Sequence, residues 1–297
     1  MRKTSPAPLK IPRLSKLGFA GQHPPTQLSL DKTYLVGVLN VTQDSFSDGN
    51  KFFKLTHSIP HALDMLEGGA DIIDIGGEST RPGSKPLGLD EELKRVLPVI
   101  QNLVRIRPNI LISIDTYKAK VAEEAIKAGA RIINDISGLA FDPAMARVAA
   151  KYQVPLILMH LKGTPQTMQA NPHYRNLKKE LLDFFAQRIN LAVKNGVKRS
   201  QIIIDPGLGF GKRLEDNYKI LGWVDELHKF GLPVMIGPSR KSFIGKVLNL
   251  PPDQRIEGTG AMAAYAVFKG IQFVRVHDVK EIKRVLTISE KIAHYAR

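Results

Sequence analysis

The sequence contains no cysteine among its 297 residues. This absence excludes disulfide bonds, thiolate metal sites and cysteine nucleophiles. No apolar run approaches the roughly 20 residues that a membrane-spanning helix needs, and residues 1–25 lack the apolar centre of a secretory signal. We therefore expect a cytoplasmic protein that does not span a membrane and that begins with a basic, flexible leader over residues 1–26.

Acidic residues are scarce relative to basic ones, with 28 Asp and Glu against 43 Lys and Arg and a net charge of +15 at pH 7. Such a charge favours solubility and attracts polyanionic ligands. The basic residues are scattered through predicted helices and do not form runs with interleaved aromatic residues, so we do not expect a nucleic-acid partner. A small phosphorylated substrate fits the charge equally well.

Strand and helix patterns alternate along the chain at intervals of about 30 residues, as βα units require. The predicted strands are Leu35–Leu39, Ile72–Ile75, Ile110–Ile114, Ile132–Asn134, Leu156–Met159, Ile202–Ile204, Val234–Ile236 and Phe273–Val276. The predicted helices are His57–Gly68, Glu91–Arg105, Lys118–Ala128, Pro143–Lys151, Lys178–Asn195, Glu215–Phe230, Gly258–Lys269 and Glu281–Ala293. Eight such units favour a TIM (β/α)₈ barrel of the α/β class over an open doubly wound sheet. We expect one domain over residues 27–297, with a strand or hairpin within Gln27–Lys32 closing the barrel floor.

Polar side chains end several of these apolar strands. They are Asp74, Asp115, Asn134 and Asp205, and the last leads into the glycine-rich turn of residues 206–212. The carboxyl ends of barrel strands meet at one mouth, where barrel enzymes place their active sites. A single carboxylate there can instead cap the next helix. Several buried carboxylates are costly unless they are paired, and the N–H edge of a 2-amino-4-oxo pterin would satisfy them, with two N–H groups donating to one carboxylate.

Cations follow the last two predicted strands. Arg240 and Lys241 stand at the predicted start of a helix, where the helix dipole disfavours positive charge unless an anion binds. Arg275 and His277 alternate along a strand and therefore point to the same side. Barrels often bind phosphate after strands seven and eight, so we favour a cationic pair for anion binding; a salt bridge to a nearby aspartate is the alternative.

The loops after the first two strands, residues 40–54 and 76–90, are long and polar, which is typical of functional loops. Thr80 and Arg81 lie in a Gly/Pro turn suited to phosphate. Asn40 and Asp48 are oxygen donors of the kind that Mg²⁺ takes together with substrate phosphates. Met159 is expected to be a core residue, and the neighbouring His160 a hydrogen-bonded structural residue.

Taken together, these segments closely resemble the dihydropteroate synthase family of the pterin-binding superfamily. The motifs that carry the resemblance are GVLNVTQDSFSDGN (37–50), IDIGGESTRPG (73–83), ISIDT (112–116), INDISG (133–138), LMHLKGTPQTMQ (158–169), DPGLGFGK (205–212), GPSRKSFIG (237–245) and VRVHDVKE (274–281). The resemblance implies a TIM barrel that joins 6-hydroxymethyl-7,8-dihydropterin pyrophosphate to p-aminobenzoate and releases pyrophosphate, a step of folate synthesis. It also implies inhibition by sulfonamides and a homodimer packed through the C-terminal helices.

The resemblance implies roles for individual residues. Asp115, Asn134, Asp205 and Lys241 would hold the pterin, with Met159, Phe210 and Gly237 lining its slot. Thr80, Arg275 and His277 would hold the pyrophosphate, with Arg81 and Asn40 nearby and Mg²⁺ held by Asn40 and Asp48. Phe46, Pro82, Lys241 and Ser242 would shape the p-aminobenzoate pocket. Catalysis would use Asp115, Asp205, Lys241, Arg275 and His277, with Phe46 and Asp48 on a loop that excludes water.

The sequence departs from the family pattern in places: Gln43 and Asn50 stand where the first loop usually has Pro and Gly, and residues 84–90 differ from the usual second loop. One alternative function is that of a methyltetrahydrofolate–corrinoid methyltransferase, against which Arg275, His277 and the Thr80–Arg81 loop argue. Another is a basic RNA- or surface-binding protein that keeps a degenerate barrel, although every expected ligand residue is present.

Overall fold

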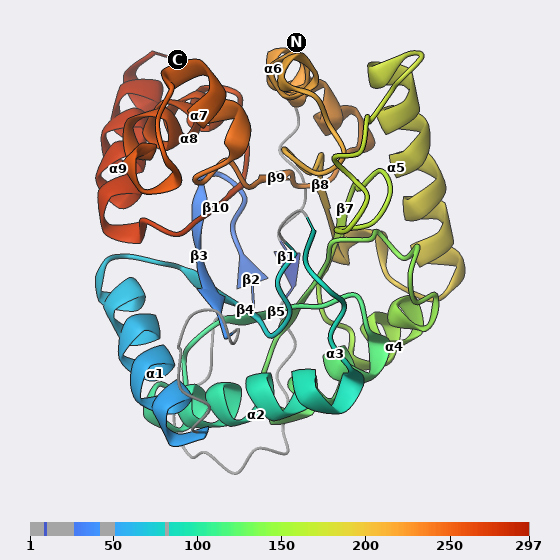
Figure 1. The fold of residues 1–297 in the computed structure, drawn as a ribbon, viewed down its shortest axis with the longest axis vertical. Coiled ribbons are helices and arrows are strands. Elements are labelled where there is room, and N and C mark those ends of the chain that lie inside the picture. The colour runs from blue at the N-terminus through green and yellow to red at the C-terminus, as the bar shows by residue number, and fades with distance from the viewer. Residues whose placement is uncertain (1–8, 11–26, 42–50, 81–82, 297) are drawn as a thin grey trace.

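The computed structural model describes residues 9–10, 27–41, 51–80 and 83–296. Within these ranges eight parallel strands lie side by side in the order β8-β7-β6-β5-β4-β3-β10-β9. They are β3 (Tyr34–Asn40), β4 (Ile72–Gly76), β5 (Ile112–Asp115), β6 (Ile132–Asp135), β7 (Leu156–Met159), β8 (Ile202–Asp205), β9 (Met235–Ile236) and β10 (Phe273–Val276). A parallel bridge between Ile204 and Val234 joins β8 to β9. The sheet therefore closes on itself, and the predicted (β/α)₈ barrel is confirmed (Figure 1).

Helices follow the strands and surround the barrel (Figure 1). They are α1 (Lys51–Glu67), α2 (Leu89–Ile106), α3 (Ala119–Ala128), α4 (Ala144–Tyr152), α5 (Leu177–Lys194), α6 (Leu214–Gly222), α7 (Ser242–Leu248), α8 (Ile256–Phe268) and α9 (Val279–Tyr295). The helix predicted over Glu215–Phe230 is wrong in its second half, because Trp223 ends α6 and residues 224–230 form a 3₁₀ helix. None of the described helices combines the length and the hydropathy that a membrane span requires.

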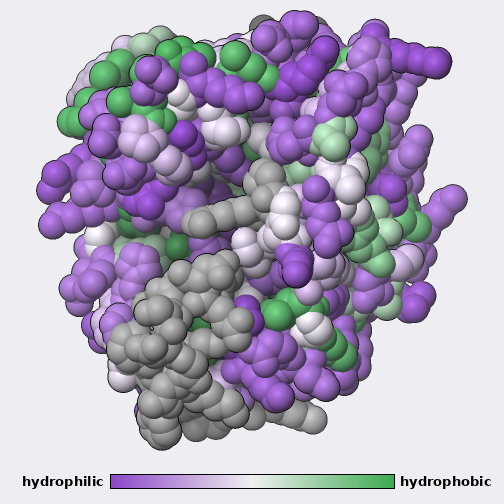
Figure 2. Space-filling view, viewed as in Figure 1, coloured by the Kyte–Doolittle hydropathy of each residue, from purple (hydrophilic) through white to green (hydrophobic). Residues whose placement is uncertain are grey.

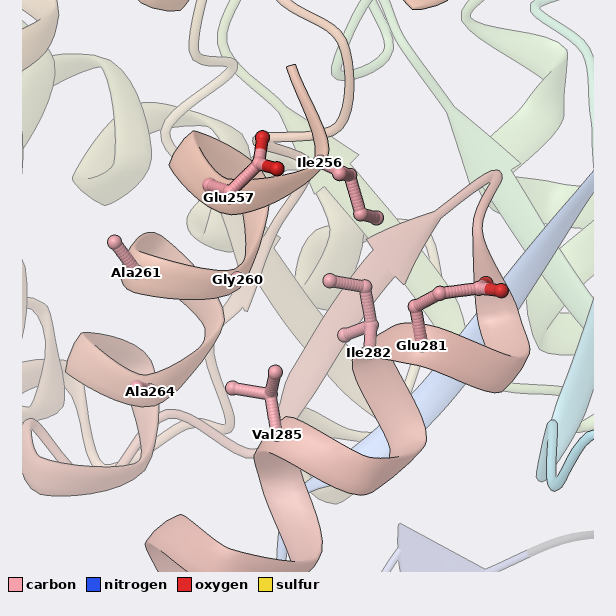
Figure 3. A pocket seen from close by; sticks show the side chains of 8 residues that line it. All are labelled: Ile256, Glu257, Gly260, Ala261, Ala264, Glu281, Ile282 and Val285. Carbon is pink, nitrogen blue, oxygen red and sulfur yellow. The ribbon is translucent and has the colours of Figure 1, made fainter. Parts of the chain in front are cut away.

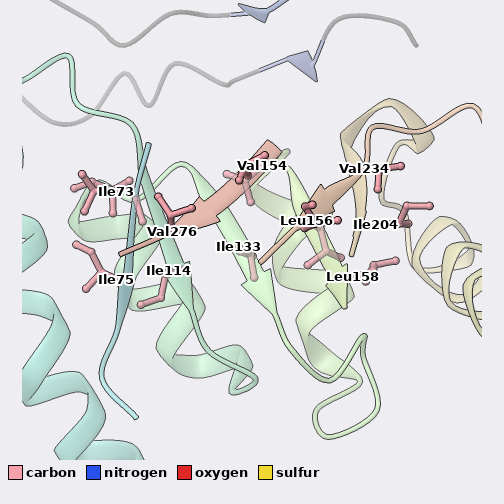
Figure 4. Close-up of a cluster of buried hydrophobic side chains, with 14 of the residues drawn as sticks. Ile73, Ile75, Ile114, Ile133, Val154, Leu156, Leu158, Ile204, Val234 and Val276 are labelled. Carbon is pink, nitrogen blue, oxygen red and sulfur yellow. The ribbon is translucent and has the colours of Figure 1, made fainter. Parts of the chain in front are cut away.

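The strands bury both of their faces, which explains why they read as continuous apolar runs. On the outer face, Ile73, Ile75, Ile114, Ile133, Leu156, Leu158, Ile204 and Val276 pack against the helices in one large core (Figure 4). On the inner face, one apolar residue from each strand forms what we call the floor layer: Val36, Ile72, Leu111, Ile132, Ile157, Ile203, Met235 and Phe273. Leu111 immediately precedes β5, and the other members lie within their strands.

The N-terminal end of the barrel is covered by a short pair of strands. β1 (Leu9–Lys10) pairs antiparallel with β2 (Gln27–Leu28), and both Leu9 and Leu28 join the cluster of the floor layer. The strand predicted within Gln27–Lys32 is therefore confirmed at Gln27–Leu28. Leu9, within the leader expected over residues 1–26, packs against the barrel and is 0% exposed. This contact could not be predicted, because a single buried leucine in a basic, proline-containing stretch produces no hydrophobic periodicity.

Candidate active site

A polar layer lies directly above the floor layer. Because strand side chains alternate, the residue two positions after each floor residue points into the same interior. Those residues are Asp74, Ser113, Asn134, Met159, Asp205, Gly237, Arg275 and the apolar Val38 of β3, and because most of them are polar we call them the polar layer. The side chains of the first five are at most 4% exposed. The sequence therefore builds an apolar plug at the bottom of the barrel and a polar site at its carboxyl mouth.

Arg275 ties this layer together. Its Nε donates to Asp74 Oδ2 at 2.6 Å, and its terminal Nη2 donates to Asp115 Oδ2 at 2.6 Å. Asn134 Nδ2 donates to the same Asp74 oxygen at 2.9 Å. The salt bridge that the sequence left open as the alternative to anion binding is therefore present at Arg275, which pairs with two of the acids. The cause is burial: two carboxylates in a closed barrel need a countercharge.

Three buried polar atoms of the layer have no hydrogen-bond partner: Asp74 Oδ1, Asn134 Oδ1 and Ser113 Oγ. Buried polar atoms are nearly always paired in native proteins, so unpaired ones call for a ligand or water. Ser113 was missed by the sequence interpretation, although its position two residues before Asp115 could have revealed it. Asp74 was noted as a strand-end acid but assigned no role.

Burial shifts the pKa values of the two other carboxylates. Removal from water raises the pKa of Asp115 to about 7, with Arg275 opposing the shift and Asp74 adding to it. Removal from water likewise raises the pKa of Asp205 to about 6, opposed first by a backbone N–H of Gly207 that donates to Oδ1 at 2.7 Å. Perturbed carboxyl groups in a barrel mouth are typical of functional sites.

An apolar wall stands beside the acids, where Met159 of β7 is in register with Asp205 of β8. Met159 and Phe210 lie in one buried cluster with Ile136 and Met168, two residues that the sequence interpretation missed. Lys241 Nζ lies 4.0 Å from the centroid of the Phe210 ring. Removal from water lowers the pKa of Lys241 to about 8, and Arg275 acts in the same direction. The structure thus brings together the carboxylates, the lysine and the aromatic wall that were predicted separately.

His277 lies at the carboxyl end of β10 and packs on the loop after β9. Its backbone N–H donates to Ser239 Oγ at 3.1 Å, and its Nδ1 lies 3.0 Å from the same oxygen. Burial lowers the pKa of His277 to about 3, and the nearby Arg275 and Arg240 add to the shift. His277 is therefore neutral near pH 7 and the predicted cationic pair carries one charge, that of Arg275.

Residues 36–277 match the family described as pterin binding enzyme. The chain is 48% identical over 262 residues to the dihydropteroate synthase of Synechocystis, a stretch that covers 88% of this chain and 90% of that relative. The chain belongs to the dihydropteroate synthase family. Members of this family are transferases of folate biosynthesis, and neither the methyltransferase nor the RNA-binding alternative finds support.

Two solved structures place the barrel in the same family. A Yersinia pestis dihydropteroate synthase in complex with a sulfonamide drug superimposes with a TM-score of 0.86 at 43% identity, covering 92% of this chain and 99% of that one. The Clostridium difficile dihydropteroate synthase, solved in the presence of pteroic acid, superimposes with a TM-score of 0.83 at 46% identity, covering 88% and 97%.

The turn after β8, which carries the sequence DPGLGFGK (205–212), is held by close packing on the loop after β7. Gly207 has φ +66°, and a Cβ there would lie 2.1 Å from the carbonyl oxygen of His160. Lys212 Nζ lies 2.9 Å from His160 Nδ1 and donates to Phe210 O at 2.9 Å. His160 is thus the hydrogen-bonded structural residue that was predicted, and Lys212 is its unpredicted partner.

The loop after β4 is anchored through Glu78. This carboxylate accepts from Tyr117 Oη at 2.7 Å, from Lys118 Nζ at 2.5 Å and from Leu87 N at 3.0 Å. Lys118 also donates to the buried Glu92 at 2.5 Å. Thr80, two residues after Glu78, is half-buried at the start of the family's Ser-Thr-Arg-Pro segment.

The remaining predicted residues divide into two groups. Asn40 ends β3 and pairs in register with Gly76, and Ser242 is the exposed first residue of α7. Phe46, Asp48, Arg81 and Pro82 lie outside the described residues. Across the residues that the structure describes, no group of three or more His, Cys, Asp or Glu side chains could hold a metal ion. The donors present suit a cation such as Mg²⁺ only if substrate phosphates supply further oxygens.

Proposed function

We propose that the polar layer of the barrel mouth is the pterin site at which this chain carries out the dihydropteroate synthase reaction. The single observation that carries the assignment is the set of unpaired buried atoms, Asp74 Oδ1, Asn134 Oδ1 and Ser113 Oγ, at the end of an otherwise satisfied network. A 2-amino-4-oxo pterin offers a row of N–H donors that would satisfy acceptors of this kind.

Asp205 and Asn134 hold the edge of the ring, and Asp115 lies beside them. Burial raises the pKa of Asp205 to about 6, so in the free protein its carboxyl group is half ionised near pH 6 and mostly ionised at pH 7. Donors from the pterin would stabilise the carboxylate and lower this pKa again. Met159 and Phe210 form the apolar wall against which the ring stacks, and Lys241 covers the Phe210 face.

Arg275, His277 and Thr80 hold the pyrophosphate, with Arg81 and Asn40 beside it. The bond between the pterin methylene and oxygen breaks, the electron pair leaves with pyrophosphate, and Arg275 neutralises part of the developing charge. His277 is neutral in the free protein, so it donates a hydrogen bond to the pyrophosphate but adds no second positive charge. The carboxylates at the edge of the ring stabilise the cation that remains. The neutral amine of p-aminobenzoate then forms the new C–N bond and releases a proton, so no nucleophilic side chain is needed.

Mg²⁺ would be held by Asn40 and Asp48 together with pyrophosphate oxygens, and it would neutralise charge on the leaving group. Lys241, Ser242, Pro82 and Phe46 would form the p-aminobenzoate pocket above the pterin. Phe46 and Asp48 would also exclude water from the cation. A cytoplasmic location stays a prediction from the sequence.

We propose a homodimer that packs through α8 and α9. An apolar groove runs between these helices and is lined by Ile256, Glu257, Gly260, Ala261, Ala264, Glu281, Ile282 and Val285 (Figure 3). Ile288 and Ile292, further along α9, are 62% and 53% exposed. Hydrophobic residues also gather over this part of the surface in Figure 2. Contiguous exposed apolar surface of this kind marks association sites.

The test is to incubate the protein with dihydropterin pyrophosphate, p-aminobenzoate and Mg²⁺ and to measure dihydropteroate. We expect turnover in the native chain, and a loss of about 100-fold or more in Asp205→Ala and Lys241→Ala with an unchanged circular dichroism spectrum. Native turnover in either variant would contradict the roles assigned to these residues.

A further inference from the structure

Two consecutive residues of the loop after β9 pair with two consecutive residues of the loop after β10. Ser239 Oγ accepts from the backbone N–H of His277 at 3.1 Å. Arg240 Nε donates to Asp278 Oδ2 at 3.0 Å, and its Nη2 donates to Asp278 Oδ1. The second contact is a bidentate arginine–carboxylate pair, a geometry that fixes the relative orientation of both groups.

The backbone of Arg240 is in an unusual conformation. Its φ is +56°, in the left-handed region, which is unfavourable for a residue with a Cβ. Surrounding groups impose this conformation: the carbonyl oxygen of Arg240 accepts from Arg255 Nη1 at 2.9 Å, and its amide donates to the buried Thr259 Oγ1 at 3.4 Å. Backbone strain that is held in place from several sides is typical of functional sites.

The strained residue lies between the two halves of the site. Lys241, the next residue, covers the Phe210 ring, and Arg255 Nη1 also donates to the carbonyl oxygen of Lys241 at 3.3 Å. On the other loop, Asp278 directly follows His277. The Arg240–Asp278 pair therefore fixes the distance between the backbone that carries Lys241 and the backbone that carries His277.

We propose that Arg240 and Asp278 are positioning residues that hold the p-aminobenzoate side of the site in register with its pyrophosphate side. Neither residue touches substrate in this role; each acts through its neighbour in the chain. The inference rests on the proposed function, because it assigns a purpose to the spacing between Lys241 and His277.

The alternative is a surface salt bridge without function. The Arg240 side chain is 42% exposed and that of Asp278 19%, and pairs of this exposure contribute little to stability. Glycine would adopt φ +56° without strain. A merely structural role therefore predicts that Arg240→Gly is harmless to activity, whereas a positioning role predicts a folded protein with impaired activity.

The experiment compares the native chain with Arg240→Gly, Asp278→Asn and the double variant. We expect both single variants to keep a Tm within about 5 °C of the native value, and to lose roughly 10- to 100-fold in kcat/KM for p-aminobenzoate through misplacement of Lys241 and His277. The double variant should lose no more than the worse single variant, because both changes break the same pair. Pterin affinity, measured by calorimetry, should stay within about threefold of native, since its main contacts come from other strands.

Lys269→Gln serves as the matched control. Lys269 pairs with Asp225 at 3.2 Å with side-chain exposures of 26% and 25%, and this pair lies between α8 and the 3₁₀ helix of residues 224–230. The Lys269→Gln variant should therefore keep the native kcat/KM for p-aminobenzoate.

Native kcat/KM in Arg240→Gly, or losses that add in the double variant, would overturn the proposal. If Arg240→Gly lowers the Tm steeply, Asp278→Asn, which keeps shape and backbone, decides the question by the same criterion. Absence of turnover in the native chain would contradict the proposed function. The positioning role of the Arg240–Asp278 pair would then be tested by pyrophosphate binding, which Asp278→Asn should weaken and Lys269→Gln should not.

Discussion

At the scale of single residues, burial brings the pKa values of two acids and the lysine of the mouth close to neutral pH. It raises the pKa of Asp115 to about 7 and of Asp205 to about 6, and it lowers the pKa of Lys241 to about 8. Each shift favours the uncharged form, and a ligand that supplies N–H donors to the two acids would lower their pKa values again. The buried charged groups of the free site therefore lower the stability of the folded protein until substrate binds. Such a loss of stability at an active site is a common cost of activity.

Asp205→Asn should stabilise the free protein at neutral pH. A carboxyl group with a raised pKa in the folded state contributes stability that is fully present below pH about 4 and is lost as the pH rises through about 6. Asparagine keeps the acceptor for the Gly207 N–H without the charge. We expect a gain of about 1–3 kcal/mol at pH 7.5 that shrinks towards pH 4, measured by urea denaturation.

The exposed Asp183 on α5 is the control, since Asp183→Asn should change stability little at either pH. A gain from Asp205→Asn that is equal at pH 4 and pH 7.5, or a loss at pH 7.5, would contradict the raised pKa.

At the scale of elements, the strands were the easiest part to predict. Strands β7 and β10 match the predicted Leu156–Met159 and Phe273–Val276 to the residue, because parallel strands buried on both faces read as short apolar runs. For helix α7 only a start at Arg240 and Lys241 was predicted and no extent, since its seven residues are too few to show a helical period. The acids and cations at strand ends were predicted because alternation places them at one mouth.

What the sequence could not reveal were the partners of those residues. Arg275 contacts Asp74 and Asp115 across sequence separations of 201 and 160 residues, and Arg240 meets Asp278 across 38. No local pattern encodes such pairs; they follow from barrel closure. The cationic pair expected at Arg275 and His277 carries only one charge, because burial and the nearby Arg275 and Arg240 lower the pKa of His277.

The turn after β8 provides a test at this scale. Gly207→Ala forces a Cβ to 2.1 Å from the His160 carbonyl oxygen at a backbone φ of +66°. We expect a loss of about 3 kcal/mol or more in unfolding free energy, because the clash is with backbone and cannot be relieved by a rotamer change.

Gly222→Ala is the matched control. Gly222 ends α6, and a Cβ there meets nothing within 4 Å, so alanine should be neutral or stabilising by up to about 1 kcal/mol. Thermal unfolding of both variants distinguishes them. Similar Tm values would contradict the expected clash and show that the turn can rearrange to accommodate the added Cβ.

At the scale of the whole molecule, the barrel separates stability from function. The floor layer and the outer core supply packing, and the polar layer and the carboxyl-end loops supply chemistry, as in other barrels. The α8–α9 face lies on the outside of the barrel and is available for association without obstructing the mouth.

Ile288→Glu and Ile292→Glu should shift the protein from dimer to monomer at micromolar concentration, because each places a charge in the proposed interface. Analytical ultracentrifugation measures this. Val193→Glu, at an apolar residue of α5 that is 44% exposed, should leave the sedimentation coefficient unchanged. A monomeric native chain, or an undisturbed dimer in both α9 variants, would contradict the proposed interface.

Binding of the pterin ring by the polar layer is the step on which the other assigned roles depend. The most direct measurement is a crystal structure of the protein with bound 6-hydroxymethyl-7,8-dihydropterin pyrophosphate. We expect a ring against Phe210 and Met159 whose N–H edge meets Asp205 and Asn134, with the diphosphate towards Arg275 and His277. A ring bound elsewhere, or one that leaves Asp205 and Asn134 without a hydrogen bond to it, would contradict the account.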